Sequence, residues 1–589
     1  MSQPTTDVKE PKKDYKNIIP NKKEIIKQYL TEKDFAVKLR QQKINNWMKN
    51  EEQYNGVIQR TLLTRSNLHV PLVFEGVQNF ASKLGSSPDF EYDTIPEGDE
   101  NASEIMKHVV QEDLNESDWK IMYENSKIEA GIYGRTIYKV IPGNDKNTVE
   151  LVDTLAFLIS PIAKNTRSAL YCGQQFIYKT IEEIEAEAEE FEYDTEEIEK
   201  LKQNKVPNET QQDSSTEASY KNTRFANMGL SNTTNYGSKV AECTEWWTMI
   251  KNDDVTAEPY VLLVANDLYL LRCKKASEIG IPSYRNNPFV SWGTYTRGIT
   301  FWCPSVADVY RDPNLAIDVN INQVIDNNTY RNFGMLFVAS SSGLKQSSIV
   351  PRPLGVTSVQ TAPGENIQSK VWQFVPPEIS SAASTMQLVK GLADSAAGLS
   401  PNISPGKGKV SVTQQAKISA EIDAKIAVMK RNATMAFQEL TQLMADITQE
   451  KLTKPRKVKI FGYKNLTVED VTKKNFEDVQ LVSKATPSED SEQNKAIKQK
   501  AKIELYELFK DDPKVPGQLA MRRSVAKSFD IQPTEIESWF TEEEKTPQAQ
   551  AQIPQQPQEP SAGNPPSEDT ALLSQTGREA QINVPRSIK

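Results

Sequence analysis

Histidine and cysteine are scarce in this sequence. The 589-residue chain has two histidines, His69 and His108, and neither belongs to an HExxH sequence or to a triad-like pattern. Imidazole-based catalysis is therefore not expected, and both are typical of partly buried helix residues. The four cysteines are far apart and form no CxxC pair: Cys172, Cys243, Cys273 and Cys303. They predict neither a zinc site nor a disulfide framework, and are typical of small buried residues in a reducing compartment.

Long apolar stretches and an excess of positive charge are also absent. The first residues, MSQPTTDVKEPKKDYK, are polar, and no window approaches the ~18 consecutive apolar residues of a membrane span. We therefore expect no signal peptide and no membrane partner, with synthesis and use in the cytosol. The chain has 70 Lys plus Arg against 79 Asp plus Glu. This balance argues against a protein that coats DNA, so any contact with nucleic acid should be local or transient.

A phosphate-binding loop is missing as well. The stretch LSPNISPGKGKVSVTQQ, residues 399–415, has glycines and lysines, but Lys409 is followed by Val410 and no glycine stands at the upstream position that a P-loop requires. Nucleotide binding is not expected here. The simplest interpretation is a flexible connection between two helices whose lysines stay solvated.

Apolar residues at helical spacing predict several helices. Residues 22–54 predict one or two amphipathic helices on the surface, and the segment 69–90 predicts a buried helix that ends at Gly85 and leads into a strand. Further helices are predicted within residues 304–333 and 378–399. The most regular pattern, from Ile418 to Ile447, predicts one long core helix.

Alternating and β-branched segments predict strands between these helices. Hairpins are expected within residues 131–159 and 245–275, and a strand pair within 456–486 that could complete the earlier sheet. The acidic stretch 181–199 predicts a solvated helix, for which Thr180 and Glu183 fit a capping box. Together these elements predict an α+β fold.

Low-complexity and small-domain signals mark the remaining regions. Residues 206–238 are rich in Asn, Ser, Thr and Gln and predict a long mobile loop. Residues 488–545 predict a small helical domain. The stretch 546–589 predicts a disordered tail, and residues 1–21 a flexible N-terminal arm.

The order of these elements over residues 22–545 resembles the portal proteins of tailed bacteriophages. The resemblance rests on the mixed half that carries HVPLVFEGVQNFASKLGSSP, followed by the helix PSVADVYRDPNLAIDVNINQVIDNNTYRN, a β-rich piece and the return helix PPEISSAASTMQLVKGLADSAAGLSP. It implies a multidomain subunit whose parts follow in chain order: a wing (22–303, with the acidic helix and mobile loop at 180–240), a first stem helix (304–333), a clip (334–377), a second stem helix (378–399), a tunnel loop (400–413), a long wing helix with strands (414–487) and a helical crown (488–545).

The resemblance also implies a function. Portal proteins form a ring, usually of twelve subunits, at one capsid vertex, through which double-stranded DNA is packaged and ejected. They dock the terminase large subunit, the major capsid protein or a scaffold, and a tail adaptor. The chain would then be a virion protein assembled in the host cytoplasm. It would be a passive conduit rather than an enzyme, with no cofactor and no metal.

Three groups of site residues follow from the resemblance. In the tunnel loop, four residues would face DNA: Lys407, Lys409, Ser411 and Thr413. On the first stem helix, four carboxylates either face the lumen and repel DNA or are simply solvated: Asp308, Asp312, Asp318 and Asp326. In the clip, apolar residues would contact the neighbouring subunit or the motor: Phe337, Val338, Val356, Val371 and Trp372.

Two other classes of protein share some of these features. A ring-forming or scaffolding virion protein would have similar helices and a similar tail but no DNA-sized channel. A nuclease or NTPase could hold Mg²⁺ on clustered carboxylates, but the acidic stretch has no lysine or histidine arranged for catalysis.

Overall fold

The computed structural model describes most of the chain up to residue 486. The described residues are 21–57, 65–95, 100–143, 145–203, 240–251, 257–332, 335–342, 344, 359–399, 412–452, 455–462, 465–476, 479–486, and isolated positions between 500 and 525. All of them except Val525 belong to one compact unit that ends at residue 512. The predicted loop 206–238, the crown and the tail fall almost entirely outside the described residues.

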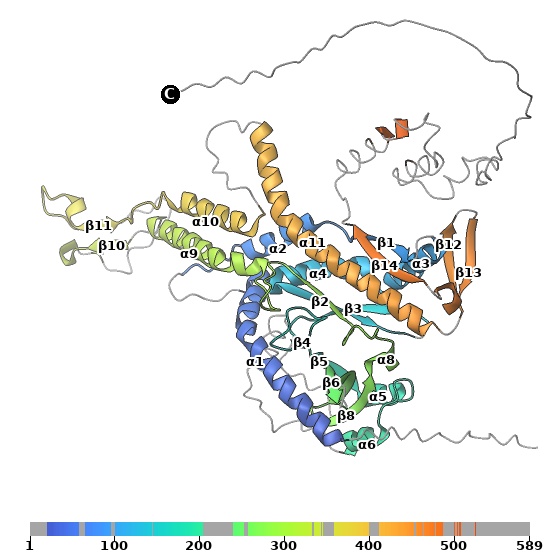
Figure 1. Ribbon diagram of the computed structural model, residues 1–589. Helices are drawn as coiled ribbons and strands as arrows, with labels where there is room; N and C mark the ends of the chain where they lie inside the picture. Colours follow the sequence, from blue (N-terminus) through green and yellow to red (C-terminus); the bar gives the residue numbers. More distant parts are fainter. Residues whose placement is uncertain are drawn as a thin grey trace, which may run out of the picture. The chain divides into compact units, whose positions relative to one another are not determined.

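The described chain alternates helices with short antiparallel strands (Figure 1). The helices are α1 Lys22–Tyr54, α2 Leu72–Leu84, α3 Glu100–Glu116, α4 Trp119–Tyr133, α5 Ile181–Glu187, α6 Thr195–Gln203, α8 Ala276–Ile279, α9 Val306–Asn332, α10 Ala382–Ala397 and α11 Val412–Lys451. The strands are β1 Asp89–Ile95, β2 Arg135–Ile141, β3 Thr148–Val152, β4 Phe157–Ile159, β5 Cys172–Thr180, β6 Val240–Lys251, β7 Ala257–Ala265, β8 Tyr269–Lys275, β9 Phe289–Gly293, β10 Met335–Val338, β11 Val371–Phe374, β12 Arg456–Gly462, β13 Asn465–Val471 and β14 Gln480–Thr486.

The strands form two main sheets and three separate pairs. One sheet has the order β4-β5-β6-β7-β8 and the other β3-β2-β9, and all neighbours are antiparallel. These sheets confirm both predicted hairpins and the α+β class. The expectation that residues 456–486 complete the earlier sheet is wrong, because β12 pairs with β13 and β14 pairs with β1, nearly four hundred residues away.

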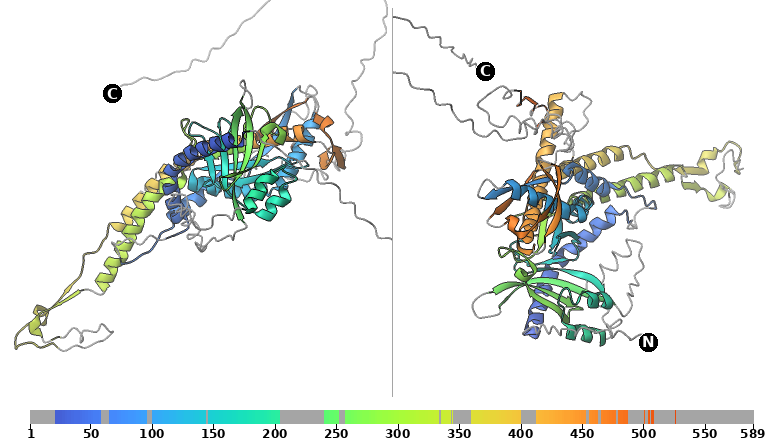
Figure 2. Two further views of the ribbon diagram at one scale, coloured as in Figure 1. Left: turned by 90° about the horizontal axis from the view of Figure 1, so that it is seen from below. Right: turned by 90° about the vertical axis from the view of Figure 1, so that its right-hand side faces the viewer.

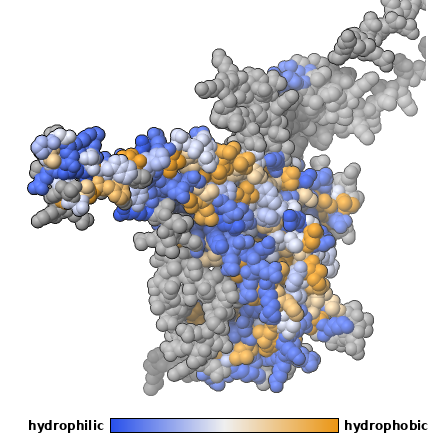
Figure 3. All heavy atoms as spheres, turned by 90° about the vertical axis from the view of Figure 1, so that its left-hand side faces the viewer, coloured by the Kyte–Doolittle hydropathy of each residue, from blue (hydrophilic) through white to orange (hydrophobic). Residues whose placement is uncertain are grey.

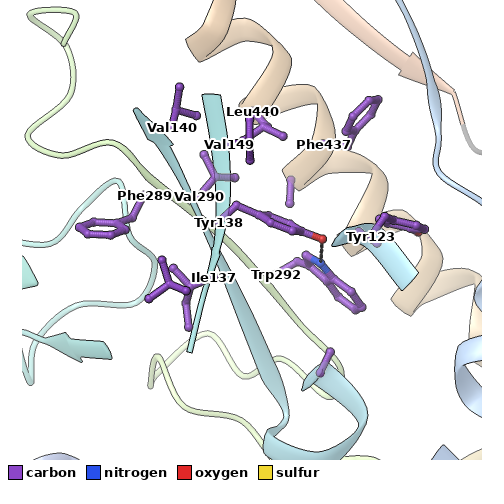
Figure 4. Close-up of a cluster of buried hydrophobic side chains, with 14 of the residues drawn as sticks. Tyr123, Ile137, Tyr138, Val140, Val149, Phe289, Val290, Trp292, Phe437 and Leu440 are labelled. Atoms are coloured by element: carbon purple, nitrogen blue, oxygen red, sulfur yellow. Dashed lines mark hydrogen bonds between the residues drawn. The ribbon is translucent and has the colours of Figure 1, made fainter. Parts of the chain in front are cut away.

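The main core lies between α11 and the β3-β2-β9 sheet (Figure 4). Tyr138 of β2 is fully buried there, accepts a hydrogen bond from the Trp292 indole at 3.3 Å and donates one to Ser126 at 2.5 Å. Phe437 of α11 stacks on Trp119 with ring centroids 5.2 Å apart. The apolar spacing of α11 is thus explained by one buried face. That face consists of Ile426, Met429, Ala433, Ala436, Leu440, Leu443 and Ile447, whereas Val428 and Met435 are exposed.

Helix α1 differs from the predicted surface helix. Phe35 is exposed, but Tyr29 and Trp47 are buried, and the Trp47 ring lies 4.9 Å from that of Trp302. A buried arginine, Arg40, donates to the Leu155 carbonyl at 2.5 Å. The helix therefore contacts both the main core and the five-stranded sheet along its length.

The acidic stretch forms two short helices instead of one. Its capping box is present, with the Glu183 amide donating to the Thr180 hydroxyl and the Thr180 amide donating to the Glu183 carboxylate. The chain then turns after α5, because the Asp194 amide donates to the Leu271 carbonyl of β8 at 2.8 Å. This tertiary hydrogen bond starts α6 against the sheet, so the stretch is only partly solvated.

Candidate functional site: the α9–α10 hairpin

Helices α9 and α10 lie side by side and lead to a small strand pair at their far end (Figures 1 and 2). In this pair, β10 and β11 are antiparallel, with Phe337 opposite Trp372 and Val338 opposite Val371. The two rings contact each other at a centroid distance of 5.3 Å, yet Phe337 is 50% exposed and Trp372 is 58% exposed. Two helices and the strand pair, called here the α9–α10 hairpin, therefore present an aromatic pair to solvent.

A capping box begins α9. The Ser305 amide donates to Asp308 and the Asp308 amide donates to the Ser305 hydroxyl, both at 2.9 Å. The same carboxylate accepts a hydrogen bond from the Asn50 amide of α1 at 3.0 Å. Asp308 thus stabilises the start of the helix and fixes it to α1.

Four polar residues of α9, one helical turn apart, hold an extended segment against the helix. Asn314 accepts from the amides of Leu72 and Val73, Asp318 accepts from the amide of Val70, and Asn322 exchanges two hydrogen bonds with the backbone of Leu68. Asp326 accepts from the amides of Arg65 and Ser66 at 2.7 and 2.9 Å and from the Ser66 hydroxyl at 2.6 Å. We call Asn314, Asp318, Asn322 and Asp326 the Asn/Asp ladder.

The spacing of the ladder follows from helix and strand geometry. Four residues of α-helix advance about 6.0 Å along the axis. Two residues of extended chain advance about 6.6 Å. One step of the ladder therefore matches two residues of segment 65–73, which runs antiparallel to α9 and has no strand partner of its own among the described residues. The segment is extended as far as Pro71, and its last two residues, Leu72 and Val73, begin α2. The ladder provides acceptors for backbone amides of this segment; one of these, the Leu72 amide, also donates to the Val70 carbonyl at 2.7 Å.

Electrostatic contacts reinforce the ladder. The Asp318 carboxylate lies 2.8 Å from Nδ1 of His69, whose other ring nitrogen is 3.3 Å from the Gln53 carbonyl oxygen of α1. Hydrogen bonding by Ser66 holds the pKa of Asp326 below its usual value of 3.8. The carboxylates of Asp318 and Asp326 therefore both stabilise the contact between segment 65–73 and α9.

Separate contacts join α9 to α10. The Tyr310 hydroxyl donates to Asp394 at 2.7 Å, and burial raises the pKa of Tyr310 well above its usual value, so it stays a donor. At the far end, Asn327 donates to the Pro377 carbonyl at 3.2 Å, and Arg331 pairs with Glu378 at 3.3 Å. Helix α9 is thus bound to α10 near one end and to the residues just before α10 near the other.

The predicted site residues fare differently. Lys407, Lys409 and Ser411 lie outside the described residues, as does Val356, and α11 begins at Val412, so Thr413 is in its first turn. Asp312 is the most exposed of the four predicted carboxylates, with 79% of its side chain accessible. The other three make the hydrogen bonds described above, a bracing role that the sequence prediction did not include. That these carboxylates line a lumen stays a prediction.

Two ladder residues were missed from the sequence altogether, Asn314 and Asn322. Their spacing of four residues from Asp318 and Asp326 was a usable signal, since it places all four on one side of a helix. The segment that they bind could not be identified, because it lies roughly 250 residues away in the chain.

Comparison with known proteins identifies the family to which this chain belongs. A family model described as the phage SU10 portal protein matches residues 88–474, well over half of the chain. The chain belongs to this family of phage portal proteins. No curated protein matches the sequence significantly.

Membership in this family bears on the class of the protein and on the part of the chain that the family shares. The family is structural and not a family of enzymes, which agrees with the expected class of phage virion protein. The matched residues include all of the α9–α10 hairpin and most of the core that supports it. Among the described residues, no helix has the length and apolar character needed to cross a membrane.

Proposed function

We propose that this portal protein forms a ring-shaped channel at one capsid vertex, through which double-stranded DNA enters and leaves the capsid. The family match over residues 88–474 carries the proposal. The ring is expected to contain twelve subunits, with the packaging force supplied by a separate motor, the terminase large subunit. The remaining partners are the major capsid protein or a scaffold, and a tail adaptor. Assembly takes place in the host cytoplasm, before the protein becomes part of the virion.

The α9–α10 hairpin is the proposed stem, and the β10–β11 pair with residues 334–377 the proposed clip. The exposed rings of Phe337 and Trp372 support a docking role, because aromatic residues that are half exposed on one chain often become buried at an interface. In this proposal Val338, Val371 and Val356 extend the same contact toward the neighbouring subunit and the motor.

The loop 400–413 is the proposed tunnel loop. Lys407 and Lys409 would contact phosphates without distinguishing bases, and Ser411 and Thr413 would add hydrogen bonds. Two lysines per subunit make a sparse positive band in a subunit whose net charge is −9. A sparse band lets DNA slide, whereas a wall lined with cations would hold it in place.

Negative-stain microscopy with mass photometry of the full-length protein tests the channel. The expected result is a ring with a central hole and a mass near twelve times the 66.3-kDa subunit. Where the purified protein is monomeric, the same measurement is made after co-expression with the capsid and scaffold proteins of the same phage. A closed dimer, a filament or a disc without a hole under both conditions contradicts the proposal.

A further inference from the structure

Helix α10 has one face against the protein and one face that is largely exposed, apart from Lys425 of α11, which donates to the Ser395 carbonyl at 2.9 Å. Ala382, Ala393 and Ala397 are buried on the inner side, next to α9. The outer side carries two leucines one turn apart, Leu388 and Leu392, which are 61% and 55% exposed. Figure 3 shows hydrophobic patches among hydrophilic ones where the α9–α10 hairpin joins the rest of the subunit.

A glycine lies at the middle of this outer face. Gly391 is seven residues from Ser384 and four from Ser395, so the three share a side of the helix with Leu388. A Cβ atom added at Gly391 would meet no atom within 4 Å. Glycine weakens a helix relative to alanine, and no described residue packs against Gly391 closely enough to require it.

Gly76 in α2 is a useful contrast. A Cβ atom there would lie 2.5 Å from the ring of Tyr310, so that glycine is explained by packing within the subunit. Gly391 would be explained in the same way if another molecule approached the backbone of α10 closely, because glycine permits the shortest distance between packed helices.

A hollow with apolar residues among polar and charged ones, such as Lys49, Arg311 and Asp312, lies on the other side of α9. Figures 1 and 2 show α9 lying between α10 and α1. The hollow between α1, α9 and segment 67–69 is lined by Leu68, Leu315 and Val319, of which the two leucines are each 47% exposed. Gln53 also lines the hollow; its side chain is 91% buried, and its Oε1 atom has no hydrogen-bond donor among the described residues.

We infer that the outer face of α10 in one subunit packs into the hollow between α1 and α9 of the next copy of this chain. The inference rests on the proposed ring, and names the surfaces that build it. A ring needs two different patches on each subunit, whereas a closed dimer needs one self-complementary patch. In this contact the leucines of α10 meet Leu68 and Leu315, and Gly391 lets the two helices approach closely.

Disulfide trapping tests this contact. The double variant Leu388→Cys with Leu315→Cys should give a ladder of covalent multimers on mild oxidation, since each subunit links to the next. The single variants Leu388→Cys and Leu315→Cys should stay monomeric on a denaturing gel. Three of the four native cysteines are buried, so they should contribute little cross-linking of their own. The unaltered chain, oxidised in the same way, measures any cross-linking through native cysteines. No multimers from the double variant, or dimers from Leu388→Cys alone, overturn the inference.

Added bulk gives a second test. Gly391→Leu should lower the fraction of subunits in rings at least tenfold in mass photometry, with unchanged circular dichroism, because the site is open within the subunit. Ala383→Leu adds similar bulk to an exposed position of α10 outside this face and should leave rings intact. Normal rings from Gly391→Leu would overturn the inference while leaving the channel proposal standing. Absence of rings from the unaltered protein and its co-expressed form would overturn both.

Discussion

The Asn/Asp ladder makes a quantitative prediction at Asn322. This side chain is 96% buried, and its amide accepts from the Leu68 N–H at 2.7 Å and donates to the Leu68 carbonyl at 2.9 Å. Asn322→Leu keeps a side chain of comparable size but removes both hydrogen bonds to Leu68, along with the one that Asn322 donates to the Asp318 carbonyl within α9. Each net hydrogen bond contributes about 1 kcal/mol, and Leu68 is half exposed, so water can partly replace them. The change should lower the free energy of opening of segment 65–73 by about 2 kcal/mol.

Native-state hydrogen exchange with mass spectrometry measures this opening directly, in the full-length protein. Because ~1.4 kcal/mol corresponds to a factor of ten, amides of the segment should exchange roughly 30-fold faster in Asn322→Leu. Asn322→Asp keeps the acceptor but loses the donor, so an increase of roughly fivefold is expected. Asn320→Ala on the exposed side of α9 is the matched control and should change little. Exchange in Asn322→Leu within about twofold of the unaltered protein would refute the ladder as a stabilising contact.

Three further predictions concern packing, pH and DNA. Gly76→Ala places a methyl group 2.5 Å from a buried tyrosine ring and should destabilise the subunit by about 1–3 kcal/mol in denaturant unfolding; an unchanged midpoint would contradict the packing. Asp326 has a native pKa below 3.8 through hydrogen bonding by Ser66, so the unfolded chain binds its proton more readily. Its stabilising contribution is therefore complete above pH 3.8 and is lost as the pH falls through the lower native pKa. The stability difference between the unaltered protein and Asp326→Ala, measured by denaturant unfolding, should shrink in this acid range, and a constant difference would count against the carboxylate. In the proposed tunnel loop, Lys407→Ala with Lys409→Ala should leave rings intact but alter packaged DNA length or retention, and unchanged values of both would exclude a role for these lysines.

The elements that the sequence predicted well are those set by local chemistry. Helix α2 shows its apolar spacing at Val73, Val77, Phe80 and Leu84, all buried, and ends at Gly85 as expected. The β2–β3 hairpin and the long helix α11 have equally regular patterns. In each case the apolar residues that form the buried face, and the residue that ends the helix or forms the turn, lie close together in the sequence. A short window of sequence is therefore enough to predict the element.

Features that depend on distant parts of the chain were predicted less well. Helix α1 was expected as one or two amphipathic surface helices, but it contributes to two separate core clusters along its length and also buries Arg40. The acidic stretch was expected to be one helix, yet the backbone hydrogen bond from Asp194 to Leu271 divides it. Neither the partner residue nor the burial of the opposite face is encoded in the local pattern.

The sequence by itself determined the α+β class, the most regular helices and hairpins, and the absence of a catalytic motif, because periodicity and residue spacing are properties of neighbouring residues. It also supported the resemblance to portal proteins that the family match now shows. Only the tertiary structure decided that Asp308, Asp318 and Asp326 make hydrogen bonds within the subunit, and that Gly391 faces open space. A carboxylate or a glycine has the same identity in solvent, at an intrasubunit contact and at an interface, and its role follows from the atoms that folding brings within a few ångströms of it.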